Sequence, residues 1–105
     1  MITIMHIRYT VKAEYAAQNR ENIRRVMDNL RALHRPDLRY NVFVEDDGKT
    51  FIHLPLFASE DAKNVFEAQE AFRAFQAALR ESIPEVPPKV TNLTLVGSSH
   101  DLFSY

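Results

Sequence analysis

The fold is decided by residues 38–57, LRYNVFVEDDGKTFIHLPLF, where two strand-like runs flank a tight turn. Apolar side chains alternate with others over residues 38–45, and residues 50–57 form a second, mostly apolar run. Alternation of this kind with β-branched and aromatic residues is typical of strands. The intervening Asp47-Gly48 favours a hairpin, because glycine accepts the positive φ of tight turns. The stretch therefore predicts a β-hairpin in the middle of the chain.

On the N-terminal side of this hairpin, the sequence predicts a strand and then a helix. Residues 3–11 alternate with a period of two, and neither face is wholly polar. Over residues 13–34 the apolar side chains recur at helical spacing on one stripe, while most charged side chains lie off it. Pro36 ends this helix, since proline disfavours the α conformation in the residue before it.

On the C-terminal side, the sequence predicts a helix and then a last strand. Ser59 is a suitable N-cap for a helix that continues to Ile83 and stops before Pro84. Residues 90–96 are expected to form the last strand, after a stiff Pro-Pro connector. A tail over residues 98–105 follows, with apolar side chains at Leu102, Phe103 and Tyr105.

This order of elements predicts an α+β, ferredoxin-like βαββαβ fold spanning residues 1–105 as one domain. Its four-stranded antiparallel sheet would carry both helices on one face. The other face would hold Ile4, His6, Ile52, Leu54 and Leu56, which is too apolar to remain in water. We therefore expect a homodimer with sheet packed against sheet. The tail either crosses to the partner or folds back on its own subunit.

Composition excludes several classes of protein. The 105 residues include no cysteine, which removes disulfides, thiolate nucleophiles and cysteine-bound metals. Two glycines leave no glycine-rich phosphate loop. A net charge of −1 and the lack of an aromatic RNA-binding motif argue against nucleic-acid partners. No apolar run approaches the roughly 20 residues that span a bilayer, so we expect a cytoplasmic protein without membrane contact.

At residues 57–62, Phe-Ala-Ser-Glu-Asp-Ala, the chain resembles the dimeric α/β-barrel superfamily, and within it the antibiotic-biosynthesis-monooxygenase family. That family contains cofactor-free, quinone-forming oxygenases and haem-degrading enzymes, and its usual motif here is Trp-x-Ser-x-x-Ala. The haem-degrading branch uses an Asn, the motif Trp and a His, which align with Ile7, Phe57 and Gln76. Glutamine is a poor haem ligand, so the resemblance does not imply haem degradation. It implies oxygen chemistry on a phenolic substrate without a cofactor.

The resemblance also implies a pocket between the sheet and the helices. If Ile7 and Phe57 face the helices, alternation places Tyr9 and His53 on the same side. We assign His53 and Gln76 as candidate catalytic residues. The candidate ligand-binding residues come from strands and helices alike: Tyr9, Asn19, Phe57, Gln69 and Phe72. No metal site is expected, because His6 and His53 should point to opposite faces.

Three functions remain open at this stage. The first is a monooxygenase-like enzyme acting on a small hydrophobic or aromatic metabolite. The second is a binding protein of the same fold, and the third is a structural dimer with a packed interior. Each polar candidate also has a purely structural reading, since His53 can be a satisfied core histidine and Gln69 or Gln76 can lie at the edge of the helix.

Overall fold

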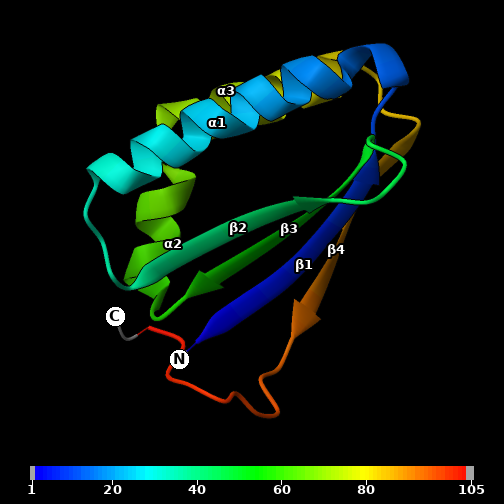
Figure 1. Cartoon of the computed structure of the whole chain (residues 1–105). Coiled ribbons are helices and arrows are strands. Elements are labelled where there is room, and N and C mark those ends of the chain that lie inside the picture. The colour runs from blue at the N-terminus through cyan, green and yellow to red at the C-terminus, as the bar shows by residue number, and fades with distance from the viewer. Residues whose placement is uncertain (1, 104–105) are drawn as a thin grey trace.

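The computed structural model describes residues 2–103 and contains a sheet covered by helices on one side (Figure 1). The elements in chain order are β1 (Thr3–Thr10), a 3₁₀ turn η1 (Ala13–Tyr15), α1 (Ala16–Ala32), β2 (Leu38–Val44), β3 (Thr50–Phe57), α2 (Glu60–Glu67), α3 (Glu70–Glu81) and β4 (Val86–Leu93). The strands form one sheet in the order β2-β3-β1-β4, and all neighbouring pairs are antiparallel. The predicted α+β, ferredoxin-like fold is confirmed.

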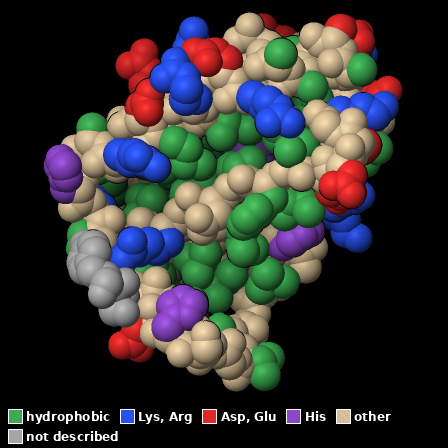
Figure 2. All heavy atoms as spheres, in the orientation of Figure 1, with side chains coloured by type: hydrophobic (Ala, Val, Ile, Leu, Met, Phe, Trp, Pro, Cys, Tyr) green, Lys and Arg blue, Asp and Glu red, His purple; other side chains and the backbone are tan. Residues whose placement is uncertain are grey.

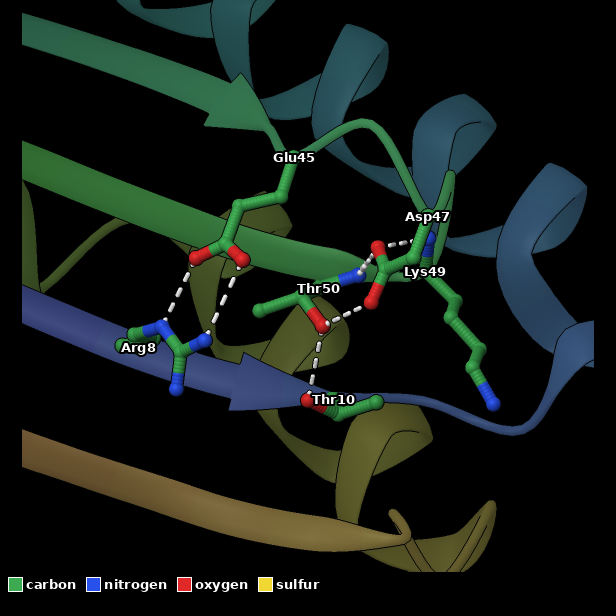
Figure 3. A network of polar contacts seen from close by, with 6 residues as sticks. All are labelled: Arg8, Thr10, Glu45, Asp47, Lys49 and Thr50. Atoms are coloured by element: carbon green, nitrogen blue, oxygen red, sulfur yellow. Dashed lines mark hydrogen bonds and ion pairs between the residues drawn. The ribbon is translucent and has the colours of Figure 1, made fainter.

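The hairpin turn is held by one carboxylate (Figure 3). Asp47 Oδ1 accepts from the backbone N–H groups of Lys49 and Thr50, at 3.0 and 2.8 Å. The Thr50 hydroxyl donates to Asp47 Oδ2 at 2.6 Å, so the Thr10 hydroxyl, 2.9 Å away, donates to Thr50. Gly48 has a φ of 73°, as the turn requires. These bonds fix the hairpin and tie it to β1.

The second predicted helix is in fact two helices. Gln69 has extended backbone angles, φ −70° and ψ 131°, and separates α2 from α3. Its side-chain amide donates to the carbonyl of Val65 at 2.8 Å, which satisfies a carbonyl at the end of α2. The break changes the helical phase, so α3 buries Phe75 and leaves Gln76 exposed. The prediction of one continuous buried stripe was therefore wrong.

The last strand begins earlier than the sequence suggested. Instead of residues 90–96, β4 covers Val86–Leu93 and includes Pro87 and Pro88. β4 lies at the edge of the sheet, next to β1 alone. Proline is tolerated in an edge strand because one side of the strand needs no ladder hydrogen bonds. The register shifts between Arg8 and Thr10 of β1, close to the prolines.

The two faces of the sheet are as alternation predicted. Phe51, His53 and Phe57 of β3 are buried under the helices. Ile52, Leu54 and Leu56 point to the other face, where they are half-buried. Phe43 of β2 is on that outer face too, and 55% of it is exposed. The outer face is therefore apolar, and within the described part of the chain no helix covers it.

The described part of the tail folds back on its own subunit. Leu102 and Phe103 are half-buried, and Arg39 Nη2 donates to the Phe103 carbonyl at 3.4 Å. Tyr105, which the sequence analysis counted among the apolar tail residues, lies outside the described residues. Within residues 2–103, no helix has the length and apolar character needed to cross a membrane.

Candidate functional site

A chain of hydrogen bonds runs through the space between the sheet and the helices. Asn19 Nδ2 donates to the Tyr9 hydroxyl oxygen at 2.9 Å. The Tyr9 hydroxyl lies 2.7 Å from His53 Nε2, and the Tyr40 hydroxyl lies 2.9 Å from His53 Nδ1. Asn19, Tyr9 and His53 are at most 4% exposed. The chain thus joins α1, β1, β3 and β2 through four polar side chains.

Strand register explains why these side chains meet. His53 pairs with Ile7 of β1 on one side and with Val42 of β2 on the other. Tyr9 and Tyr40 each lie two residues from those partners, on the same face, and so are diagonal neighbours of His53. Diagonal neighbours in an antiparallel sheet are within reach of long aromatic side chains. Histidine on the central strand is therefore bonded from both adjacent strands.

The buried groups are neutral at pH 7. Burial lowers the pKa of His53 from 6.5 to about 4, because the imidazolium form would lose its hydration. Burial also raises the pKa of Tyr9 and of Tyr40 well above the ordinary value for tyrosine. The Asn19 bond partly offsets this effect at Tyr9, since it favours the ionised hydroxyl. A neutral imidazole between two hydroxyls has one nitrogen that donates and one that accepts.

Aromatic rings surround His53. The Phe75 ring centre lies 5.4 Å from that of the imidazole, and Phe72 is 6.5 Å from Phe75. Beside His53 is a narrow space with no room for a water molecule. We call this space the inner slot. It is lined by Ile23, Val26, Met27, Tyr40, Val42, His53, Phe72 and Phe75. Ordinary ligand pockets have roughly 300–1,000 Å³, whereas this space admits no water, so the interior is closed.

An open groove lies next to the inner slot. It has a volume of about 650 Å³ and runs between the end of α1, β2 and the tail. Figure 2 shows hydrophobic side chains in the hollow between α1 and the sheet, with Lys and Arg side chains around it. Met27 and Tyr40 line both the groove and the inner slot. These two side chains therefore form the wall between solvent and the histidine.

The structure brings together only some of the candidate residues. Tyr9, Asn19 and His53 are joined directly by hydrogen bonds, and Phe72 lines the inner slot. Phe57 is buried but contacts Phe66, with ring centres 5.5 Å apart, and does not line the slot.

The two glutamines are not part of the site. Gln69 caps the break between α2 and α3 with its side chain bonded to Val65, and Gln76 is exposed. Their predicted placement on a buried stripe was wrong, because the helix break rotates α3.

Two residues of the site were missed by the sequence analysis. Tyr40 was not singled out among the alternating side chains of residues 38–45, and Phe75 was not named as a candidate. The signal for Tyr40 was present, because it shares a face with Val42 and the hairpin register places Val42 opposite His53. Phe75 could not be placed without knowledge of the helix break.

The described residues offer no metal site. No group of three or more His, Cys, Asp or Glu side chains within residues 2–103 is placed to hold an ion. His6 lies on the outer face of the sheet and His53 on the inner face, as alternation predicted.

No protein-family profile matches the chain, and no curated protein matches it. Solved structures do. An antibiotic biosynthesis monooxygenase matches with a TM-score of 0.74 and 16% identity, covering 92% of this chain and 100% of the other. A Mycobacterium tuberculosis protein, Rv0793, matches with a TM-score of 0.78 and 16% identity, covering 95% of this chain and 100% of the other.

A variant of SnoaB from Streptomyces nogalater, described as a cofactor-independent oxygenase, gives a TM-score of 0.71 and 18% identity, covering 95% and 98%. At these identities the likeness shows the fold. The chain therefore has the ferredoxin-like fold found in antibiotic biosynthesis monooxygenases, as the resemblance at residues 57–62 predicted.

Proposed function

We propose that the chain is a monooxygenase-like enzyme that oxidises a small aromatic or hydrophobic metabolite without a cofactor. One observation carries the proposal: a buried neutral His53, held between two tyrosine hydroxyls, faces an aromatic slot next to an open groove. Apolar walls with a few converging polar groups are typical of ligand sites. The shared fold with proteins named as oxygenases supports the same conclusion by analogy.

The chemistry needs only the substrate, oxygen and an environment that stabilises an anion. An acidic phenol gives its proton to water before it binds, and its anion reacts with O₂ in the site. One oxygen atom of O₂ becomes a new ring carbonyl, and the other leaves as water with the hydrogen of that ring carbon and one proton from solvent. The protein contributes preorganised hydrogen-bond donors near the developing negative charge. Tyr40 supplies a hydroxyl that lines the slot, and His53 beside it holds this hydroxyl by a hydrogen bond.

A substrate reaches the inner slot only if the wall between slot and groove opens. Met27 is the flexible part of that wall, since an unbranched thioether side chain changes rotamer easily. Its displacement would join the slot to the groove of about 650 Å³. We therefore infer that the substrate arrives through the groove between α1 and β2.

The closed slot favours a second candidate, a protein of this fold that catalyses nothing. A space with no room for water is what a packed core looks like. In that case the four hydrogen-bonded side chains serve to satisfy buried polar groups and to fix one arrangement of the sheet and helices.

Oxygen uptake distinguishes the two candidates. We would test the wild type, His53→Gln and Gln76→Ala with a panel of small phenols and quinols in an oxygen electrode. Gln76 is exposed on α3 and is the control. The enzyme proposal predicts uptake by the wild type and by Gln76→Ala, and a loss of about 100-fold or more in His53→Gln. Absence of uptake with the whole panel, or equal rates in all three proteins, would favour the packed-core candidate.

We also propose that two copies pair through the outer face of the sheet. That face carries Ile52, Leu54 and the 55% exposed Phe43. Its Arg8–Glu45 pair, with 2.8 Å between Nε and Oε2, is already neutralised within one subunit and does not repel a second copy (Figure 3). Light scattering at micromolar concentration should give the mass of a dimer for the wild type and of a monomer for Leu54→Glu. A monomeric wild type would contradict the proposal.

A further inference from the structure

The hydrogen bonds that join the four buried side chains all donate in one direction, which follows from the donors and acceptors that each side chain has. Asn19 is fully buried, and its Oδ1 has no partner while its Nδ2 donates to Tyr9. The nitrogen end of the amide therefore faces Tyr9, and one of its two N–H groups is used by the Tyr9 oxygen. Asn19 is therefore the donor at the beginning of the chain.

The direction continues through the other three side chains. Tyr9 accepts from Asn19, and among residues 2–103 its own hydrogen has His53 Nε2 as acceptor, at 2.7 Å. Tyr9 is 1% exposed, so an unpaired hydroxyl hydrogen there would be costly. The neutral imidazole then carries its proton on Nδ1 and donates it to the Tyr40 oxygen at 2.9 Å.

Tyr40 thus ends the chain as an acceptor for His53 with a hydroxyl hydrogen of its own still to donate. The hydrogen bonds of the described residues include no acceptor for it. Tyr40 lines both the inner slot and the groove, so this donor is available to a molecule that occupies either space. A donor backed by three successive hydrogen bonds is also more polarised than an isolated hydroxyl.

We propose that Tyr40 is the binding residue of this site, and that its hydroxyl donates to a carbonyl or phenolate oxygen on an aromatic ligand. The proposal rests on the proposed function in placing the ligand between the sheet and the helices. The aromatic class follows from the apolar walls, to which Val26, Phe72 and Phe75 contribute. The oxygen follows from the direction of the chain, which presents a donor and no acceptor.

The four hydrogen-bonded side chains donate a hydrogen bond to the ligand through Tyr40 and transfer no proton to it. Transfer of the Tyr40 proton to the ligand would draw a proton from His53 and, in turn, from Tyr9. The negative charge would then rest on Tyr9, inside the core, where burial disfavours the phenolate. The site therefore stabilises an oxygen that is already electron-rich, such as a ketone oxygen or the anion of an acidic phenol.

Acetophenone and α-methylstyrene provide a matched test, because they differ in shape mainly by an oxygen in place of a CH₂ group. Binding of both would be measured by calorimetry to the wild type, to Tyr40→Phe and to the control Tyr15→Phe. Tyr15 is a half-buried tyrosine whose hydroxyl bonds Asn22, away from the slot and the groove. We expect Tyr40→Phe to lose affinity for acetophenone by about tenfold and to bind α-methylstyrene unchanged. Equal changes for both compounds, no loss for acetophenone, or no binding of either compound would overturn the proposal.

The tautomer of His53 tests the same proposal without a variant. Imidazole ¹⁵N spectra of the wild type should show the proton on Nδ1 and none on Nε2 at pH 7. A proton on Nε2 would reverse the chain and overturn the proposal. The proposed function fails separately: acetophenone that binds through Tyr40, without oxygen uptake on any phenol, leaves this inference standing and refutes the enzyme. Equal oxygen uptake by the wild type and Tyr40→Phe would support the enzyme and refute the proposed role of Tyr40.

Discussion

Lowering the pH from 7 to 5 should destabilise the protein through His53. The folded pKa of His53 is about 4, and the unfolded value is 6.5. Between these values the unfolded chain binds a proton that the folded chain does not, so the stability is present above pH 6.5 and is lost as the pH falls. The full loss is about 3 kcal/mol, of which about 2 kcal/mol falls between pH 7 and pH 5. His53 is 4% exposed, so solvent screens this effect little.

Urea denaturation at pH 5, 6 and 7 measures this effect directly. The assay would use one protein concentration throughout, because association shifts apparent stability. His53→Gln is the matched control: it removes this imidazole and leaves His6, His34 and His100 in place. The wild type should lose about 2 kcal/mol more than the variant between pH 7 and pH 5. Parallel pH profiles for the two proteins would refute the claim that His53 is buried and neutral.

Three further substitutions test the packing and the turns. Ile83 is 68% exposed and has a φ of 55°, a conformation unfavourable for a β-branched residue, so Ile83→Gly should raise stability by about 1 kcal/mol in urea denaturation. Asp47→Ala removes the acceptor of the hairpin bonds and should lower the melting temperature, whereas the neighbouring Asp46→Ala should not. The bond from Thr50 lowers the pKa of Asp47, so the carboxylate stabilises the fold while it is ionised. The difference in melting temperature between the two variants should therefore persist at neutral pH and shrink as the pH falls below 3.8. Phe66→Ala should cost about 3–5 kcal/mol, since Phe66 is 4% exposed and contacts three aromatic rings; a loss below 1 kcal/mol would contradict the closed interior.

The sequence predicted the parts of the site that depend on strand periodicity. Alternation on β1 and β3 placed Tyr9 and His53 on one face, and the Asp-Gly turn set the hairpin. Helical spacing likewise placed Asn19 on the buried side of α1. These patterns are local, because a period of two or 3.6 residues fixes which face a side chain occupies.

The parts that failed depend on features that the periodicity of polar and apolar residues does not encode. At the break, the Gln69 side chain bonds the Val65 carbonyl in place of a backbone N–H group. The spacing of apolar residues along the helix does not predict this break. Gln76 was misplaced and Phe75 was missed as a consequence. Whether the slot is open depends on how Met27 and Phe72 fill it, and volume is not encoded in a pattern of polar and apolar residues.

The central claim is that the inner slot binds an aromatic compound through Tyr40. A crystal structure of the protein with acetophenone tests it most directly. We expect the ketone oxygen to lie about 3 Å from the Tyr40 hydroxyl, with Met27 displaced and the ring beside Phe72 and Phe75. Acetophenone bound elsewhere, with the slot closed and Met27 unmoved, would contradict it.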